Sequence, residues 1–509
     1  ATMTEYTSLH EVSGTSVTAP VDYANDFVDY MNASVSQFHC VAEVRRRLLG
    51  AGFVQLDERK VWSLEKAGKY FVTRNGSSII SFAVGGQFDP TTSAFMIIGG
   101  HTDSPVPVLK PTSKLMKEEH VMLGVVGYGG GIWRSWFDRD LTVVGRALVK
   151  TSEGRVEHRL VRVNKALCVI PSLAIHLSVG DERTTFKPNL QNEFPPLMAT
   201  AVKESLWRSA RSAAEGGSSS KNSSISNRHT PLVVFAVAQS LGCAVDDIVD
   251  FELQLCATQP AALVGVCDEF ISSGRLDNQG TCYTATTALI ESLSRTGELA
   301  NESSVRMVSL FDHEEVGSAS AQGAESPFFN DVMTRISTSL GADILSIKQR
   351  SFQISSDMAH AVHPNYSARH DPMHKCIMHG GLVIKHNANQ RYATNCVGAS
   401  LVREFARIAE VPIQEFAVRA DSACGSTIGP ITATQTGIRT VDVGPPQLAM
   451  HSCRELMGAD DVGNSIRVFV AAFRNFSELN KSLEVDLVGQ PDPFWSEPGN
   501  GWGQKTQDC

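Results

Sequence analysis

Residues 305–317 read VRMVSLFDHEEVG, and this stretch indicates the fold class. VRMVSLF is typical of a buried strand, and two adjacent carboxylates, Glu314 and Glu315, follow soon after it ends. Strand-like and helix-like runs alternate through the rest of the C-terminal half: LVIKH (382–386) and RTVDVG (439–444), with TATTALIESLSR (284–295) and ASLVREFARIAE (399–410). Because strands that alternate with helices form a largely parallel sheet covered on both faces, the prediction is an α/β fold.

The N-terminal part of the chain continues this pattern, and the middle part breaks it. Apolar residues at helical spacing run from Phe38 to Gly50, and strand-like runs follow at 78–84 and 94–100. From about Val106 the segments become glycine-rich and alternating, which favours antiparallel β structure. We therefore predict a discontinuous α/β domain with a mostly parallel central sheet, interrupted by a β-rich insert: residues 1–105 and 255–509 for the former, residues 106–254 for the latter.

One tract inside the insert has a different composition. Residues 215–229, EGGSSSKNSSISNRH, are rich in Ser, Gly and Asn. Such a tract buries too little apolar surface to fold, so we expect a mobile loop.

Length and composition exclude several classes of protein. At 509 residues, the chain is long enough for two or three domains. A net charge of −9 argues against a nucleic-acid partner or an anionic membrane surface. No apolar run reaches the roughly 18 residues that a membrane span needs. The N-terminal residues lack the features of a secretory signal, and the 11 cysteines stand singly, which is typical of reduced thiols. We expect a cytoplasmic protein.

Side chains of metal-ligand type follow the strands at five places. They are His101 with Asp103, Asp277, the pair Glu314 and Glu315, Asp357, and His451. In open α/β sheets, binding sites form beyond the carboxyl ends of the strands, so these groups are expected to meet there.

Taken singly, these residues have simpler explanations. A lone Asp after a strand is commonly a helix N-cap, and a lone His is commonly structural. HEEVG resembles the helical HExxH zinc motif, but Gly317 stands where the second His is required. Two adjacent buried carboxylates are harder to explain, because burying like charges unpaired is costly. A divalent metal relieves that cost by taking one carboxylate as a ligand and leaving the other as a base.

Together the residues match the needs of a two-metal hydrolase. Such a site needs two imidazoles, a carboxylate shared by both ions, a terminal carboxylate for each ion and a free carboxylate that moves the proton. Oxygen and nitrogen ligands without a thiolate suit zinc, with cobalt or manganese as substitutes. The residues that fill these places are His101, Asp277, Glu314, Glu315, Asp357 and His451.

The order of the motifs resembles the aspartyl aminopeptidase family of dizinc metallopeptidases. The resemblance covers nearly the whole chain, including the insert (YGGGIWRSWFDRDL, IPSLAIHL) and the segments IKHNANQRY and CGSTIGPI. The ordered motifs that carry it are GHTDSP, RLDN, DHEEVGS, SSDMAHAVHPNY and GPPQLAMHS. The resemblance implies an aminopeptidase-type catalytic domain and a dimerisation insert.

The resemblance also implies a role for each ligand. His101 and Asp357 would hold one zinc ion, Glu315 and His451 the other, and Asp277 would bridge the two. The two ions would share a water molecule.

Four further residues receive roles in the same way. Glu314 would act on that water as the general acid and base, and Asp103 would support catalysis by orienting the nearby histidine ligand. Lys385 would bind the acidic side chain of the substrate's first residue. His176, in the insert, would reach the active site of a neighbouring subunit, in an assembly of dimers packed into a tetrahedral dodecamer.

Several residues have other interpretations from the sequence alone. His176 lies in LAIHL, which suggests an apolar strand in the core, and Lys385 would be an ordinary strand lysine. His360 and His363 are read as loop residues or as residues behind the ligands, because the set of ligands is already complete. The chain departs from the family pattern in the length of the tract at 215–229 and in NQGTCY after Asp277.

The implied function is a zinc aminopeptidase that removes N-terminal Asp or Glu from peptides. One alternative is a dizinc aminopeptidase with a broad or neutral preference, because the metal ligands do not set the first substrate pocket. Another is a catalytically silent scaffold. The chain would act as a homo-oligomer, with neither nucleic acid nor membrane as a partner.

Overall fold

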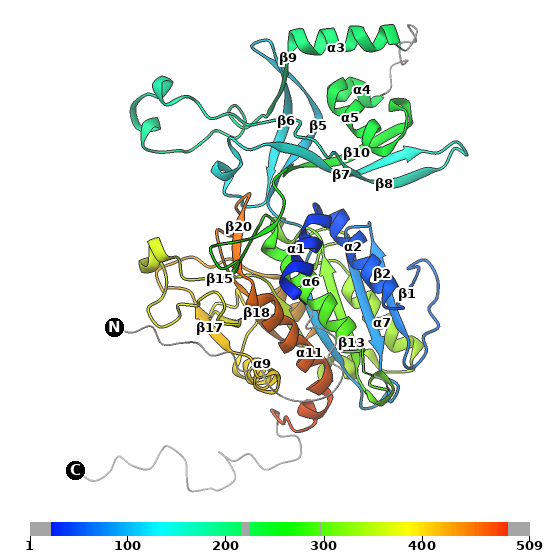
Figure 1. The fold of residues 1–509 in the computed structure, drawn as a ribbon. Coiled ribbons are helices and arrows are strands. Elements are labelled where there is room, and N and C mark those ends of the chain that lie inside the picture. Colours follow the sequence, from blue (N-terminus) through cyan, green and yellow to red (C-terminus); the bar gives the residue numbers. More distant parts are fainter. Residues whose placement is uncertain (1–21, 215–223, 296, 487–509) are drawn as a thin grey trace, which may run out of the picture.

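A mixed nine-stranded sheet organises the larger part of the molecule (Figure 1). The computed structural model describes residues 22–214, 224–295 and 297–486. The four middle strands β13, β4, β14 and β18 are parallel, as the sequence predicted, and the strands on both sides include antiparallel pairs. In spatial order the strands are β1 (Val54–Gln55), β2 (Lys69–Arg74), β3 (Ser78–Val84), β13 (Val305–Phe311), β4 (Phe95–His101), β14 (Phe352–Ser356), β18 (Arg439–Gly444), β16 (Leu382–His386) and β17 (Ile413–Ala417).

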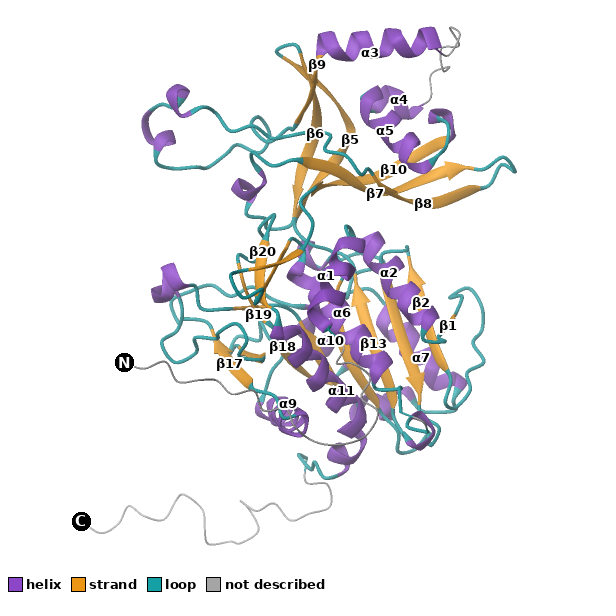
Figure 2. Cartoon of the chain, viewed as in Figure 1, coloured by secondary structure: helices purple, strands orange, loops and turns teal. Residues whose placement is uncertain are grey.

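Helices cover both faces of this sheet, which confirms the α/β fold (Figure 2). Side chains that alternate along each strand point to opposite faces, so two separate apolar cores form. On one face lie α1 (Tyr23–Ala33), α2 (Gln37–Gly50), α6 (Leu276–Glu291), α9 (Cys396–Ala409) and α11 (Asp460–Lys481). On the other face lie α7 (Phe328–Ser339), α8 (Ile344–Arg350) and α10 (Ile428–Thr436).

A small five-stranded sheet carries chain segments beside the predicted ligands. Its strand β15 begins two residues after Asp357, and His451 lies in the turn between β19 and β20. In spatial order the strands are β11 (Ala262–Val264), β12 (Phe270–Ser273), β20 (Glu455–Gly458), β19 (Pro446–Leu448) and β15 (Ala359–His360).

A six-stranded antiparallel sheet forms a separate layer above the large sheet (Figure 1). Its strands all come from residues 106–257, and the division of the chain into domains at these positions stays a prediction. In spatial order they are β8 (Val156–Arg162), β7 (Leu141–Lys150), β10 (Ile248–Ala257), β5 (Val106–Lys117), β6 (His120–Tyr128) and β9 (Leu197–Thr200). The accompanying helices are α3 (Ala201–Ala214), α4 (Ser224–Arg228) and α5 (Pro231–Leu241).

The expectation of a mobile loop over residues 215–229 is wrong for its C-terminal part. Residues 224–228 form α4, and Ile225 is only 1% exposed in the core of the insert. Ile225, the buried His229 that follows the helix and the ion pair of Arg228 with Asp250 anchor this short helix. Residues 215–223 lie outside the described residues.

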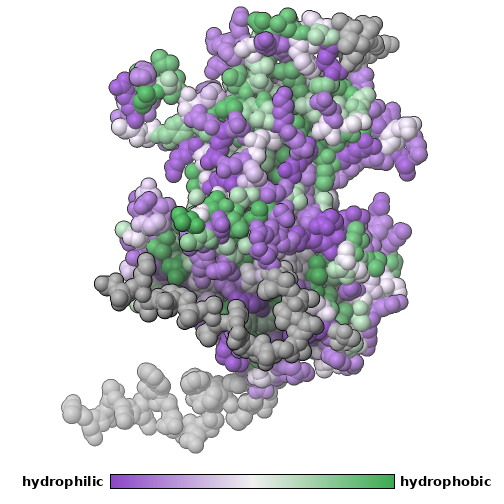
Figure 3. Space-filling view, viewed as in Figure 1, coloured by the Kyte–Doolittle hydropathy of each residue, from purple (hydrophilic) through white to green (hydrophobic). Residues whose placement is uncertain are grey.

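The strand expected around His176 is also absent. Residues 175–177 form a short 3₁₀ helix in a loop that projects from the six-stranded sheet, and His176 is exposed instead of buried. Large apolar side chains of this loop face solvent: Leu173, Ile175, Leu177 and Val179 are each exposed by 58% or more. Figure 3 shows hydrophobic and hydrophilic side chains together on the projecting loop.

No helix in the described part of the chain combines the length and the apolar character that crossing a membrane requires.

Candidate metal centre

Three neighbouring strands of the large sheet end at the same place and deliver four of the predicted residues. His101 is the last residue of β4, and it lies opposite Phe311, the last residue of β13. Glu314 and Glu315 follow β13 in a short 3₁₀ helix, Glu314–Val316. Asp357 directly follows β14. Since these strands are parallel, their carboxyl ends bring the side chains together at one edge of the sheet.

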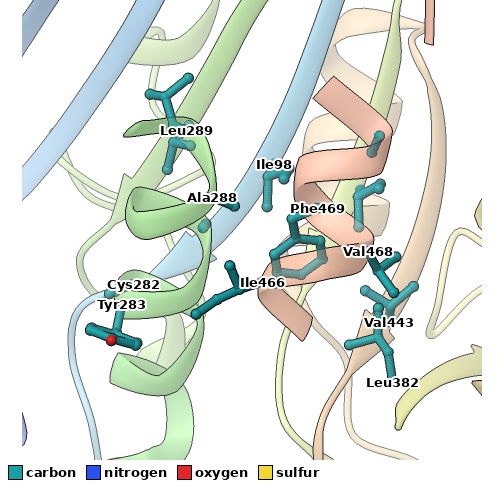
Figure 4. Packing of buried hydrophobic residues seen from close by; sticks show 14 of the residues in the cluster. Ile98, Cys282, Tyr283, Ala288, Leu289, Leu382, Val443, Ile466, Val468 and Phe469 are labelled. Carbon is teal, nitrogen blue, oxygen red and sulfur yellow. The ribbon is translucent and has the colours of Figure 1, made fainter. Parts of the chain in front are cut away.

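Asp277 enters from the first turn of α6. This helix packs against α11 in the core, and in Figure 4 Ala288 of α6 and Ile466 of α11 lie between the two helices. The backbone at Asp277 is not helical, so the carboxylate turns away from the helix axis toward His101. His451 completes the group from the turn before β20.

The distances divide these residues between the two histidines. Asp277 directs one oxygen to each: Oδ1 lies 3.3 Å from His101 Nε2, and Oδ2 lies 3.4 Å from His451 Nε2. His101 Nε2 also lies 3.7 Å from Asp357 Oδ1, and His451 Nε2 lies 3.4 Å from Glu315 Oε2. Two ligands of one tetrahedral zinc ion are about 3.3 Å apart, since each ligand bond is about 2.0–2.1 Å long. The separations around Asp277 therefore suit an ion on each side of it.

Buried atoms without a partner support the same fit. His101 Nε2, Asp277 Oδ1 and Glu315 Oε1 are buried and have no hydrogen-bond partner. Leaving such groups unpaired costs free energy, and nitrogen and carboxylate donors are the atoms that zinc accepts. His101, Asp277 and Glu315 can place ligand atoms within 4.8 Å of one another, and so can His101, Glu314 and Asp357. The residues present therefore fit a metal ion.

The pKa shifts at the centre reflect an excess of negative charge. Burial, together with the neighbouring carboxylates Asp357, Asp103 and Asp277, raises the pKa of Glu314 to about 8. Burial and Asp277 raise the pKa of Glu315 well above its usual range. For His451, burial disfavours the protonated form, but the hydrogen bond to Asp277 and the charge of Glu315 outweigh it and raise its pKa to about 10. Cations stabilise such a cluster.

Asp103 lies behind the ligands and organises them. Its Oδ1 lies 3.3 Å from His101 Nδ1, the ring nitrogen that faces away from Asp277. Its two oxygens also accept hydrogen bonds from the backbone N–H groups of Glu314 and Glu315, each at 3.1 Å. Tyr128, from β6, donates its hydroxyl to Oδ2 at 2.6 Å. Asp103 therefore fixes the orientation of one histidine and the backbone of both glutamates.

The sequence reasoning missed Glu455, which plays a comparable part. This buried carboxylate accepts hydrogen bonds from the backbone N–H groups of His451, at 2.7 Å, and Asp277, at 3.2 Å. It therefore links two residues that are 174 positions apart in the sequence (451 − 277). No motif surrounds it in SCRELM, and only the pairing of β12 with β20 brings it near Asp277.

Lys385 is buried on β16, with 2% exposure. Its ammonium donates a hydrogen bond to the carbonyl oxygen of Met358, the residue after Asp357, at 3.2 Å. The ring of Tyr392 lies 5.0 Å from the same Nζ atom, within the range of a cation–π contact. The lysine therefore lies beside the cluster without belonging to it.

Three other histidines do not join the cluster. His360 packs its ring against Phe416, and His363 packs against Tyr366. His176 lies on the projecting loop of the other sheet. The structure thus brings together the six predicted ligand and base residues with Asp103 and Lys385, and it leaves His176 apart.

Comparison with known proteins places these features in a family. The model of the aminopeptidase I zinc metalloprotease family (M18) matches residues 30–473. The chain is 46% identical over 490 residues to a "Probable aspartyl aminopeptidase" of Ricinus communis, covering 93% of this chain and 99% of that protein. It is 44% identical to the aspartyl aminopeptidase of Caenorhabditis elegans, covering 91% of this chain and 97% of that protein.

Solved structures show the same likeness. The fold superposes on a chain from the cryo-EM structure of the Ape4 and Nbr1 complex with a TM-score of 0.86 and 42% identity, covering 91% of this chain and 88% of that one. A chain of the mApe1 dodecamer of Saccharomyces cerevisiae gives a TM-score of 0.77 at 28% identity, covering 91% of this chain and 98% of that one.

Proposed function

This chain belongs to the aminopeptidase I zinc metalloprotease family (M18), and from that premise we propose that it removes N-terminal aspartate or glutamate from peptides, with two zinc ions in each subunit. The observation that carries the acidic preference is Lys385, a buried ammonium beside the carboxylate cluster. The names of the relatives from Ricinus communis and Caenorhabditis elegans support the same preference.

Asp277 is the residue that would link the two ions. One ion would be held by His101, Asp357 and the first oxygen of Asp277, and the other by Glu315, His451 and its second oxygen. When bound, the ions would lower the pKa of a water molecule and stabilise negative charge on the scissile carbonyl. One oxygen of Asp277 points to His101 and the other to His451, and this supports the division of the ligands between two ions.

Glu314 is the residue that would move the proton. Its Oε2 lies 3.8 Å from His101 Nε2, so the carboxylate borders the metal pocket. It would take a proton from the attacking water and deliver it to the leaving nitrogen of the peptide. Asp103 would hold Glu314 in place through the backbone, and it would hold His101 through its ring.

Lys385 would set the preference for the first substrate residue. A charge-assisted hydrogen bond between its ammonium and the side-chain carboxylate of Asp or Glu would be strong in a buried pocket. A neutral side chain would leave the ammonium unpaired, so it would be rejected.

The projecting loop supports a homo-oligomer. Leu173, Ile175, Leu177 and Val179 expose apolar surface around His176, and such a patch is typical of a protein interface. Because His176 lies away from the metal centre of its own chain, it would serve the centre of a neighbouring subunit. We extend this to a dodecamer, the assembly named for the structural relative from Saccharomyces cerevisiae, and we propose that it is built from dimers.

The test of the acidic preference is the hydrolysis of matched amide reporters that begin with Asp, Glu, Ala or Leu. We expect hydrolysis of the Asp and Glu reporters, lost after chelation and restored by zinc. Metal-dependent activity on Ala or Leu instead would keep the metal centre and remove the proposed role of Lys385. No activity from protein that carries its full zinc content would favour a silent scaffold.

A further inference from the structure

Lys385 lies beside a second buried charged group, the carboxylate of Asp442 on the neighbouring strand of the large sheet. Strands β16 and β18 are antiparallel, with Val383 opposite Gly444 and Ile384 opposite Val443. The next pair in this register is Lys385 and Asp442. Residues that lie opposite each other on neighbouring strands point to the same face of a sheet, so the two side chains share one side. Lys385 is 2% exposed and Asp442 is fully buried.

The carboxylate of Asp442 is fixed on all sides. Its Oδ1 accepts a hydrogen bond from the Thr427 hydroxyl, and its Oδ2 accepts one from the backbone N–H of Ala393, both at 2.6 Å. Gly429, in the first turn of α10, passes so close that a β-carbon there would lie 2.4 Å from the carboxylate. Burial raises the pKa of Asp442, and the charge of Lys385 opposes this rise. Asp442 is therefore held in one position, and its carboxylate interacts electrostatically with the ammonium of Lys385.

A nearby negative charge stabilises the buried ammonium of Lys385. Burying an unpaired ammonium is costly, and a nearby anion offsets part of that cost. Within the described parts of the chain, no carboxylate lies within 4.0 Å of Lys385 Nζ, so the lysine has no direct ion-pair partner. Asp442 can then stabilise the charge from a distance without occupying the N–H groups that a substrate carboxylate would use.

Asp442 also positions the loop that packs against the lysine. Ala393, which donates to Asp442, directly follows Tyr392, whose ring lies 5.0 Å from Lys385 Nζ. Thr394 adds a second tie, because its hydroxyl accepts a hydrogen bond from the backbone N–H of Asp442 at 2.9 Å. Loss of the carboxylate would therefore affect both the electrostatic surroundings of the lysine and the loop against it.

We propose that Asp442 is a positioning residue for substrate selectivity: it supplies a buried negative charge beside Lys385 and holds the loop against it, while leaving the ammonium free for an acidic side chain. This inference rests on the proposed preference for N-terminal Asp or Glu. It adds a residue that acts through Lys385 and does not touch the substrate.

The test is the Asp442→Asn variant, which keeps the shape and removes the charge. The readout is the ratio of kcat/KM for Asp and Ala reporters, because effects on the metal centre cancel in this ratio. The titratable groups around Lys385 are Tyr392, in the loop that follows β16, His360 on β15 and Asp442 on β18. We expect the ratio to fall about tenfold, because the ammonium loses the buried negative charge beside it and the loop with Tyr392 loses its anchor.

The matched control is Thr427→Val, which removes a hydrogen bond to the same carboxylate and keeps its charge. We expect its ratio to stay much closer to the wild-type ratio than that of Asp442→Asn. An unchanged ratio in Asp442→Asn, or an equal loss on both reporters, would overturn the inference. If the wild-type protein itself shows no acidic preference, the proposed function fails, and this inference fails with it.

A stability cycle decides the question even where Asp442→Asn folds poorly. Replacing both members of a buried charge pair by neutral groups costs less than removing one of them. We therefore expect Lys385→Met to rescue the melting temperature of Asp442→Asn. If Asp442→Asn lowers the melting temperature as much in the Lys385→Met background as in the wild type, the two residues are independent and the inference is wrong.

Discussion

Glu314 and Glu315 are neighbours in the chain, yet their carboxylates have different surroundings. Glu315 directs Oε2 to His451 at 3.4 Å, and its Oε1 is buried without a hydrogen-bond partner. The nearest carboxylate oxygen of Glu314, Oε2, lies 3.8 Å from His101 Nε2, farther than the ligand contacts around Asp277. The backbone N–H groups of both are held by Asp103, so the two side chains cannot exchange positions. This difference supports a ligand role for Glu315 and a proton-transfer role for Glu314.

We predict that Glu314→Gln keeps the bound zinc and loses turnover. The amide retains the size of the side chain but does not take up a proton, so kcat should fall about 10²–10⁴-fold, the usual contribution of a general base. Zinc content by mass spectrometry and kcat on the Asp reporter measure the two effects. Glu315→Gln is the control, and it should lose zinc. A Glu314→Gln variant that binds less than half the wild-type zinc would make Glu314 a ligand instead.

At the scale of elements, the short helix α4 and the start of α5 bury a histidine between two strands of the insert. His229 forms a hydrogen bond with the Ser113 hydroxyl on β5 at 2.8 Å, and its ring lies 4.4 Å from the ring of Phe251 on β10. Burial, with the nearby charge of Arg228, lowers the pKa of His229 to about 4. The histidine is therefore neutral in the fold.

This histidine predicts a loss of stability in acid. The pKa in the folded chain lies below the unfolded value of about 6.5, so the unfolded chain binds the proton more readily. The contribution to stability is complete above about pH 6.5 and is lost as the pH falls toward 4, with about 2 kcal/mol gone at pH 5. Urea unfolding at pH 7 and pH 5 measures it.

The variant His229→Asn isolates this contribution. Its amide can still bond to Ser113 but carries no titrating group, so its loss of stability between pH 7 and pH 5 should be smaller than that of the wild type. Part of the loss remains, because burial also lowers the pKa of His39, on α2, to about 4. Equal losses in both proteins would show that His229 does not contribute to the acid sensitivity.

The sequence predicted those parts of the site that follow directly from single strands. His101, Glu314 and Asp357 stand just after apolar runs, so the local pattern is enough to place them at the carboxyl ends of parallel strands. The local sequence pattern could not identify Glu455 and Asp442, because their roles depend on which strands pair and in which register. A residue far away in the chain supplies their partners, and no local pattern records it.

Local composition misled the prediction in the insert for a related reason. The polar tract before His229 contains one apolar residue, Ile225, and the insert's core captures it. LAIHL around His176 has the apolar character of a buried strand, but its apolar side chains point outward. Composition reports how much apolar surface a segment has, and it does not report whether the same chain or another copy covers it.

At the scale of the whole molecule, His176 lies on the loop that projects from the six-stranded sheet, and the carboxylate cluster lies at the carboxyl ends of β4, β13 and β14 in the large sheet. Figure 1 shows these two sheets as separate layers. Leu173, Ile175 and Leu177 surround the histidine with exposed apolar surface. Burying such a patch is favourable, so contact with a second copy would stabilise the loop and present His176 to it.

We predict that His176 acts across a subunit boundary, which can be tested by mixing two defective variants. His176→Ala should lose most of its activity on the Asp reporter, and Glu314→Gln should be inactive. In co-expressed mixed oligomers, a Glu314→Gln subunit still offers His176 to the intact centre of a His176→Ala neighbour. With random pairing, about half of the His176→Ala subunits have such a neighbour, so activity should return to about a quarter of the wild-type level. The measurement is specific activity of oligomers purified through different tags on the two variants. Activity no higher than the sum of the two parent proteins would place His176 outside the neighbour's active site.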